Sequence, residues 1–376
     1  MKKIKNFEHI NILRIITKIV LLLLIVNFGW ILIPDSIPAS VNIYNWLADG
    51  RERFPFGENP DKSFNLSLFN IDAMFASHKI NNDISNSNYR IFLVGDSSIW
   101  GFLQTPQATL AGLLDKRIAS EHIEVFNFGY PSISVLKDAL VIDHAMRYKP
   151  DLIIWFTTLE ALPIEKQLST PINENNKHKI FTLLDTYQID QIEIEKPSSL
   201  ERTFLAQRRN LYDVIRLQIY GVLWGATGID QDYPESYRNA QRDFPEPKEE
   251  YYGLETKAQL ENALALEIIE KTIIRNNTTT FILVNEPILV SSGENSEFQY
   301  NFYYPVWAYD AYREIINTFS AKNNIKYYDL WNIIPEMEFT NSAIHLTTYG
   351  EKQLSDRIHE IILENIGEDN FGIEKQ

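Results

Sequence analysis

Short apolar runs alternate with longer segments of helical periodicity over residues 89–366. Five runs have the length of strands, at residues 90–94, 123–127, 151–156, 280–284 and 325–329. Helical periods occur at residues 108–119, 135–148, 257–275, 305–322 and 348–366. This alternation predicts an α/β domain with a parallel sheet, right-handed crossovers and helices on both faces. In such sheets ligands bind beyond the carboxyl ends of the strands, so the residues that follow each strand matter most.

Two stretches depart from this pattern. Residues 35–88 are rich in turn-forming residues and have little periodicity, and we interpret them as a linker and strap leading to a domain at 89–376. Residues 161–255 form an insertion between the third and fourth strands. Its segment 210–228 is apolar, but its charged residues argue against a second membrane span. We expect a helix that lies over the active-site mouth or on the membrane surface.

The N-terminus has the pattern of a membrane signal. Arg14 and Lys18 precede an uncharged apolar run at residues 19–33. We therefore expect residues 1–34 to form a cytoplasmic stub and a transmembrane signal anchor, with everything after it outside the cytoplasm. A cleaved signal peptide is the alternative. It is disfavoured because residues 37–39 (IPA) place Ile and Pro where a cleavage site prefers small residues.

Composition and charge narrow the function classes. The chain of 376 residues has no cysteine, which excludes disulfides, cysteine nucleophiles and thiolate metal sites. Five of the 35 basic residues and one of the 50 acidic residues lie in the first eighteen positions, so the rest carries a net charge of −19. A domain with this negative charge is repelled by the phosphates of nucleic acids, so we expect no nucleic-acid partner. We find no phosphate loop or metal-ligand pattern, and we expect no cofactor and no metal.

Three strand ends or loops carry candidate chemistry. The first strand is followed by Gly95-Asp96-Ser97, which can place a serine at a helix N-terminus near backbone N–H groups that stabilise an oxyanion. Taken alone, this tripeptide is also a common turn or helix cap. Gly129 follows the second strand and can approach a ligand closely, or it is a plain loop glycine. His345 lies in a loop at the same sheet edge and can reach the serine as a base, although a lone histidine is more often structural.

These segments resemble the SGNH/GDSL hydrolase family. GDSSIWG, FNFGYPS, the Lys-Pro-Asp before the third strand and NSAIHLTTYG occur in that family's order and spacing, over roughly residues 88–366 with the insertion unmatched. The resemblance implies a three-layer α/β/α sandwich, flavodoxin-like, with strand order 2-1-3-4-5. It implies Ser97 as nucleophile, His345 as general base, and the N–H groups of Ser97 and Gly129 as oxyanion donors.

The chain departs from the family in two blocks. The family's third block is Gly-x-Asn-Asp, whereas this chain has Thr-Thr-Leu-Glu at residues 157–160, so the hydroxyl of Thr157 or Thr158 is the substitute donor we consider. The family's last block is Asp-x-x-His, but Ser342 stands three residues before His345. We expect Asn341 to orient the imidazole, and we leave the alternatives Ser342, Glu336 and Glu338 open.

Four more residues are candidates for substrate binding. Asp96 precedes the serine, and Glu286 follows the fourth strand, where it can bind a sugar hydroxyl or cap a helix. Tyr304 and Trp307 belong to an aromatic cluster that can stack on a sugar ring or pack in the core.

Two functions follow from these features. The first is a single-pass membrane protein with an extracytoplasmic serine esterase or O-acyltransferase domain, acting on a cell-envelope or exported glycan. The resemblance implies a membrane O-acyltransferase as a partner. The second is an SGNH-like binding or scaffold protein of low or no activity, which the missing asparagine and aspartate favour.

Overall fold

In a computed structural model, the structure describes residues 11–33, 43–57, 67–81, 89–118, 123–227, 231 and 233–366. Five parallel strands form one sheet in the order β2-β1-β3-β4-β5, which confirms the expected topology. Their bounds are β1 Tyr89–Gly95, β2 Ile123–Gly129, β3 Leu152–Thr157, β4 Thr280–Asn285 and β5 Lys326–Asp329. Gly95 pairs with Gly129, so β1 and β2 end level with each other. The segments that follow these two strands therefore begin side by side.

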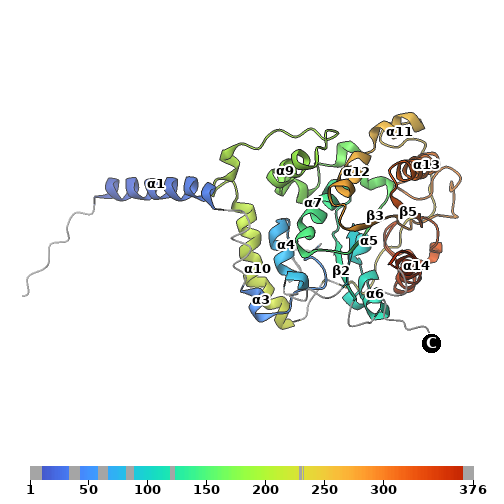
Figure 1. Cartoon of the computed structure of the whole chain (residues 1–376), viewed down its shortest axis with the longest axis horizontal. Coiled ribbons are helices and arrows are strands. Elements are labelled where there is room, and N and C mark those ends of the chain that lie inside the picture. Colours follow the sequence, from blue (N-terminus) through green and yellow to red (C-terminus); the bar gives the residue numbers. More distant parts are fainter. Residues whose placement is uncertain are drawn as a thin grey trace, which may run out of the picture.

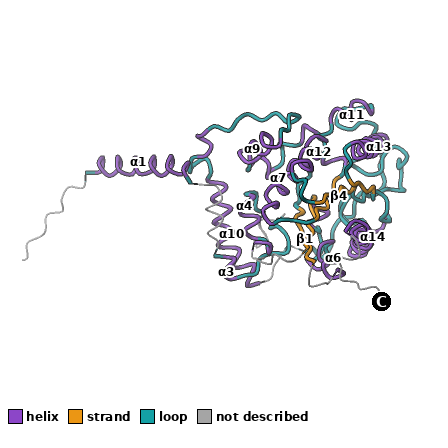
Figure 2. The backbone as a smooth tube through the Cα atoms, in the orientation of Figure 1, coloured by secondary structure: helices purple, strands orange, loops and turns teal. Residues whose placement is uncertain are grey.

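Helices cover both faces of the sheet, which confirms the expected α/β/α arrangement (Figure 1). The covering helices are α6 Leu110–Ile118, α7 Val135–Ala145, α11 Lys257–Ala263, α12 Leu266–Arg275, α13 Val306–Lys322 and α14 Thr348–Ile366. Residues of α7, α12 and α13 share one buried cluster, and residues of α6 and α14 share another. Figure 2 shows the strands enclosed between these helices.

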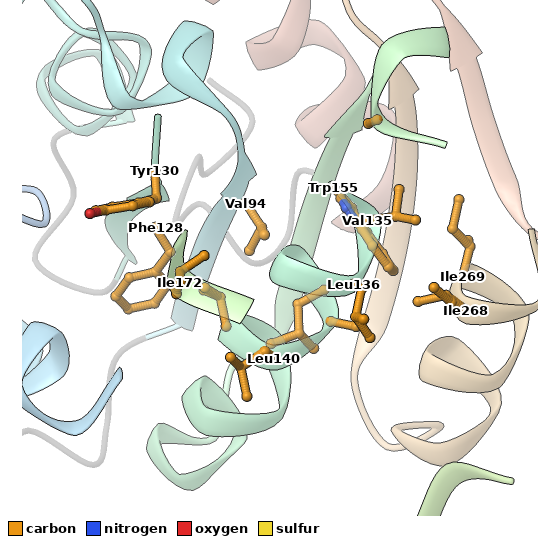
Figure 3. Packing of buried hydrophobic residues seen from close by; sticks show 14 of the residues in the cluster. Val94, Phe128, Tyr130, Val135, Leu136, Leu140, Trp155, Ile172, Ile268 and Ile269 are labelled. Atoms are coloured by element: carbon orange, nitrogen blue, oxygen red, sulfur yellow. The ribbon is translucent and has the colours of Figure 1, made fainter. Parts of the chain in front are cut away.

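Alternate residues of each central strand enter the two buried clusters. Val94 and Trp155 point to the side of α7 and α12, whereas Leu93 and Ile154 point to the side of α6 and α14. Figure 3 shows the first cluster, in which Leu136 and Leu140 of α7 lie between the strands and Ile268 of α12. Burying both faces explains why the central strands read as continuous apolar runs.

The expected single helix at residues 257–275 is in fact two helices. Leu264 and Ala265 separate α11 from α12, and Leu264 forms an antiparallel bridge with Pro163. The N–H of Ala265 donates to the carbonyl of Leu162 at 2.8 Å. These backbone bonds to a distant loop replace the helical bonds, so helical periodicity alone could not locate the break.

Helix α1 (Ile12–Gly29) is apolar and extends away from the domain (Figure 1). Residues 12–32 are long and apolar enough to cross a membrane, and none of that window is buried in the protein. Length and composition support a span only weakly, because a signal sequence has the same properties. The candidate cleavage site at residues 37–39 lies outside the described residues.

The described parts of the segment interpreted as a linker and strap include the short α-helices α3 Tyr44–Leu47 and α4 Ile71–Ser77. Every residue of α4 is buried, so this part of the segment is packed into the domain. Between the two helices lies Arg53, whose side chain is fully buried. Its guanidinium donates to the carbonyls of Trp100 at 2.9 Å, Gly101 at 2.7 Å and Gln104 at 2.8 Å.

These three bonds predict a large stability effect at Arg53. We expect Arg53→Ala to lower the free energy of unfolding by about 3 kcal/mol, because it removes three buried hydrogen bonds from a charged donor together with the packing of its side chain. Arg117→Ala is the matched control, since Arg117 forms an ion pair with Asp356 at half-exposed positions and should cost less than about 1 kcal/mol. Denaturant titration of the full chain in detergent measures both. Equal losses in the two variants would contradict the role given to Arg53.

Candidate active site

The candidate nucleophile sits on a short helix that begins directly after β1. Helix α5 (Ser97–Trp100) is capped by Asp96, whose carboxylate accepts from the N–H of Ser98 at 2.8 Å. The helix ends at Gly101, which has a φ of 82°, and a Cβ there would meet Thr109 Cγ2 at 2.3 Å. A glycine is therefore required for both backbone conformation and space. The result is a tight turn that fixes Ser97 at the carboxyl edge of the sheet.

The structure brings Ser97, His345 and Asn341 together. His345 Nε2 lies 2.7 Å from Ser97 Oγ, although the two residues are 248 positions apart in the chain. On the other side of the ring, Asn341 Oδ1 lies 2.8 Å from His345 Nδ1. An amide oxygen can only accept a hydrogen bond, so Nδ1 carries the proton and Nε2 presents its lone pair to the serine hydroxyl. This tautomer is the one that a general base requires.

The loop that holds His345 is closed by backbone bonds. Phe339 and Leu346 form an antiparallel bridge, and the N–H of Thr340 donates to the carbonyl of His345 at 2.8 Å. The side-chain amide of Gln104 donates to the carbonyl of Leu346 at 2.8 Å, which ties this loop to the turn after α5.

The other candidates for orienting His345 have different partners. Glu336 accepts from the hydroxyl of Ser292 at 2.7 Å, and Glu338 accepts from Thr347. The described contacts of the imidazole include neither glutamate.

The imidazole of His345 is held in its neutral form. Burial lowers its pKa from the ordinary value to about 3. The ring of Phe102 stacks on it, with centroids 4.5 Å apart and planes 19° apart. An apolar ring on one face and a neutral amide at one edge provide no charge to stabilise an imidazolium, so the pKa stays low. The site can accept a proton from Ser97 only transiently.

Gly129 lies against the nucleophile helix. A Cβ on this residue would meet the backbone N of Trp100 at 2.3 Å, so only glycine permits this approach. The N–H of Gly129 donates to Asn127 Oδ1 at 3.0 Å, and the amide of Asn127 donates to the carbonyl of Ile99 at 2.8 Å. In the expected role as oxyanion donor, Gly129 would exchange its bond with Asn127 for one with the substrate.

Two threonine hydroxyls at the end of β3, those of Thr157 and Thr158, are the candidates for a substitute oxyanion donor, and they differ in their hydrogen bonds. Thr158 is fully buried, and its hydroxyl lies 3.1 Å from the hydroxyl of Tyr304. Thr157 Oγ1 is buried and has no hydrogen-bond partner among the described residues. An unpartnered buried hydroxyl is costly unless a ligand or water engages it. Of the two hydroxyls, that of Thr158 is therefore already engaged by Tyr304, whereas that of Thr157 is not engaged by any described residue.

A buried acidic pair lies beneath the nucleophile turn. Glu286 accepts from the hydroxyl of Ser98, and its carboxyl is near that of Asp96. Burial, followed by the charge of Asp96, raises the pKa of Glu286 well above its ordinary value, which favours the neutral form of this carboxyl. Burial also raises the pKa of Asp96, while Lys137 opposes that shift. Lys137 Nζ donates to the carbonyl of Gly95 at 2.7 Å.

Two expected substrate-binding residues are core residues instead. Glu286 and Tyr304 are each about 1% exposed, so neither offers a surface to a sugar. The expectation that these two side chains bind substrate is therefore corrected. Neighbouring aromatic rings such as Tyr309 cover Tyr304, and Glu286 is buried beside Asp96. Asp96 is buried as the cap of α5, so it supports the turn in this structure. Trp307 is half-buried, and its indole N–H donates to the carbonyl of Glu249 at 2.6 Å.

Sequence reasoning missed Phe102, Asn127 and Lys137. Phe102 directly follows the motif GDSSIWG and Asn127 lies in the motif FNFGYPS, but their contacts with His345 and Ile99 depend on how the loops close. Lys137 lies in α7, where a lysine is ordinarily a surface residue, and nothing in its local sequence indicates full burial. Within the described part of the chain, no group of three or more His, Asp or Glu residues could hold a metal ion.

Comparison with known proteins adds structural neighbours only. No family model matches the chain, and no curated protein matches it. A member of the lipolytic protein G-D-S-L family from Veillonella parvula is 11% identical, covering 73% of this chain and 97% of its own, with a TM-score of 0.35.

Two further solved structures are similar at the same level. The lipase/acylhydrolase from Enterococcus faecalis is 15% identical, covering 73% of this chain and 95% of its own, with a TM-score of 0.38. A carbohydrate acetylesterase family member from Sinorhizobium meliloti is 12% identical, covering 76% of this chain and 100% of its own, with a TM-score of 0.34.

Because the residue that contacts His345 Nδ1 is the uncharged Asn341, we predict an unusual pH dependence for the reactivity of Ser97. With a pKa of about 3, the imidazole is unprotonated throughout the neutral range. The rate at which a fluorophosphonate labels Ser97 should therefore not fall between about pH 8 and pH 5. In Asn341→Asp, a carboxylate replaces the amide oxygen 2.8 Å from Nδ1. It should raise the pKa of His345, shift the acid limb toward about pH 6.5 and speed labelling at pH 8 by about tenfold.

Ser342→Asp is the matched control, because it adds the same charge one residue away from the residue that contacts the ring. An unchanged rate and pH profile in Asn341→Asp would show that Asn341 does not orient His345.

Proposed function

We propose that the protein is a membrane-tethered, extracytoplasmic serine esterase or O-acyltransferase that forms an acyl-enzyme on Ser97. The observation that carries the proposal is the 2.7 Å contact between Ser97 Oγ and His345 Nε2, with Nδ1 held by Asn341. A serine, a correctly protonated imidazole and an orienting group are the elements of nucleophilic acyl transfer. Their position beyond the carboxyl ends of the strands is where such sheets bind ligands.

The chemical steps use only these side chains and the substrate. Ser97 Oγ attacks the carbonyl carbon of an ester while its proton passes to His345 Nε2. The ester C–O bond then breaks, and the leaving alcohol takes the proton from Nε2, which leaves an acyl group on Ser97. In the second half, water or an acceptor hydroxyl attacks the acyl carbon and gives its proton to Nε2. Ser97 Oγ leaves and recovers that proton.

The acyl-enzyme can pass its acyl group to water or to another hydroxyl. Ser97 and His345 are each only 9% exposed, which limits the access of bulk water. Restricted water access favours transfer to a bound acceptor over hydrolysis. We therefore keep both reactions in the proposal, with O-acetyl groups as the acyl substituent.

The membrane helix bears on the substrate and the partner. If α1 anchors the domain outside the cytoplasm, a cell-envelope or exported glycan is the substrate that stays within reach. A membrane O-acyltransferase is the partner we propose to supply the acyl group. Basic residues before the apolar helix support this orientation, since such residues remain in the cytoplasm.

Covalent labelling tests the proposal directly. We expect a fluorophosphonate to label the full chain in detergent and the protein to cleave an aryl acetate slowly. Ser97→Ala should abolish labelling, and His345→Ala should lower its rate by about 10²-fold or more, because the hydroxyl then lacks its base.

Matched controls separate chemistry from folding. Ser342→Ala removes another hydroxyl near the site, and His359→Ala removes a partly exposed imidazole on α14; both should keep the parent rate. If the parent protein binds a glycan but neither the label nor the aryl acetate reacts, the scaffold function replaces the enzymatic one.

A further inference from the structure

Helix α10 (Arg208–Thr227), within the insertion, has apolar side chains on two opposite faces. The inner face packs on the domain through Val214, Leu217 and Gly221, which are buried. The outer face is uncovered, and its members are between 36% and 58% exposed: Tyr212, Ile215, Ile219, Val222 and Leu223. Successive members of this set are three, four, three and one residues apart in the sequence, so their side chains lie along one side of the helix.

Asp213, which argued against a membrane span in the sequence, belongs to the inner face. Its carboxylate accepts from the N–H groups of Phe69 at 2.8 Å and Asn70 at 3.0 Å, next to the start of α4. The carboxylate of Asp213 is therefore satisfied inside the domain, and Arg216, which pairs with it at 3.8 Å, lies over the ring of Tyr212 at the edge of the outer face. A helix with this arrangement can lie flat on a surface but cannot be surrounded by lipid.

Helix α3 extends the same surface. The ring of Tyr44 packs against Gly221, where a Cβ would meet Tyr44 Cδ2 at 2.6 Å, and the N–H of Ile43 donates to Gln218 Oε1 at 2.6 Å. These contacts fix α3 beside the C-terminal half of α10. Trp46 is 88% exposed and Leu47 65% exposed. We call the outer residues of α10 together with Ile43, Trp46 and Leu47 the α3–α10 surface.

The membrane helix leaves the domain at one end of this surface. Trp30 contacts Phe204 edge-to-face at 5.2 Å, and Asn27 Oδ1 accepts from the N–H of Leu205 at 2.9 Å, just before α10. Figure 1 shows that α1 points away from the domain while α10 runs crosswise to it, at the end of the domain from which α1 emerges. A helix across the axis of a membrane anchor lies along the plane of the membrane.

We propose that the α3–α10 surface docks on the lipid bilayer that α1 crosses, with α10 and α3 lying in its interface. This inference rests on the proposed membrane span of α1. Three features favour lipid over a soluble protein as the occupant. The anchor ends beside the surface, and the ten Cα–Cα links between Ile33 and Ile43 span at most about 36 Å, so α3 stays near the membrane. The outer faces combine a tryptophan and a tyrosine with aliphatic side chains, as interfacial helices do.

The third feature is charge at the junction. A cavity of about 500 Å³ lies between the end of α1 and the start of α10. Its lining holds five cationic side chains, Lys177, Lys179, Arg202, Arg208 and Arg209, against three carboxylates. An excess of cations at the membrane surface suits anionic lipid headgroups. Docking by this surface would fix the distance and orientation of the domain relative to the bilayer, whereas an anchor alone would let the domain reorient.

The chain has no cysteine, so a single introduced cysteine gives a unique probe site. We would label Ile219→Cys, Trp46→Cys, Leu23→Cys and Tyr349→Cys with a polarity-sensitive fluorophore. The full chain would be placed in phosphatidylcholine–phosphatidylglycerol vesicles with or without brominated acyl chains. Leu23 reports on α1, and Tyr349 of α14, which is 59% exposed, is the control on another part of the domain. We expect brominated lipid to quench Ile219, Trp46 and Leu23 at least about twofold and to leave Tyr349 unchanged.

A second variant tests the apolar contact itself. Ile219→Asp should move the Trp46 probe back into water, whereas Ile274→Asp, at a residue of α12 that is 60% exposed, should not. If Leu23 is quenched but Ile219 and Trp46 stay in water, the docking proposal fails and the anchor stands. If Leu23 is not quenched, the anchor itself fails. Shielding of Ile219 from water without quenching by lipid would assign the surface to a protein and overturn the proposal.

Discussion

The parallel sheet imposes the constraint on which the site depends. Because β1, β2 and β3 run in one direction and in register, the segments that follow them all start at one edge. The loop before α14 returns to that edge, where the backbone bridge between Phe339 and Leu346 fixes it. A hydroxyl and an imidazole that are 248 residues apart meet there without any direct sequence link. Any change that shifts a strand by one residue would separate them.

The side chains that contact His345 are uncharged, whereas ionisable side chains lie beneath the turn that carries Ser97. His345 is oriented by an amide and covered by Phe102, so its pKa is low and it is a weak base at rest. The ionisable groups lie one layer below, where burial and the charge of Asp96 raise the pKa of Glu286 and Lys137 donates to the carbonyl of Gly95. These groups hold the turn that carries Ser97 rather than take part in proton transfer. Positioning and proton transfer therefore depend on different residues.

The sequence predicts the sheet well because each central strand is a continuous apolar run that only a covered strand explains. It predicts Ser97 and His345 as partners because both follow strands at the same edge. It cannot decide among Asn341, Ser342 and two glutamates, since that depends on how a loop closes on itself. The break between α11 and α12, and the burial of Tyr304, arise from contacts with distant segments that local periodicity does not record.

Arg53 links the segment between α3 and α4 to the turn that holds Ser97. It precedes the first strand by more than thirty residues, yet its guanidinium closes the backbone after α5. The catalytic unit is thus larger than the sheet and its covering helices. If α1 anchors the domain, a protease that cuts before Arg53 would release it with the turn of Ser97 intact, whereas a cut between Arg53 and β1 would break the covalent link of the cation that holds this turn.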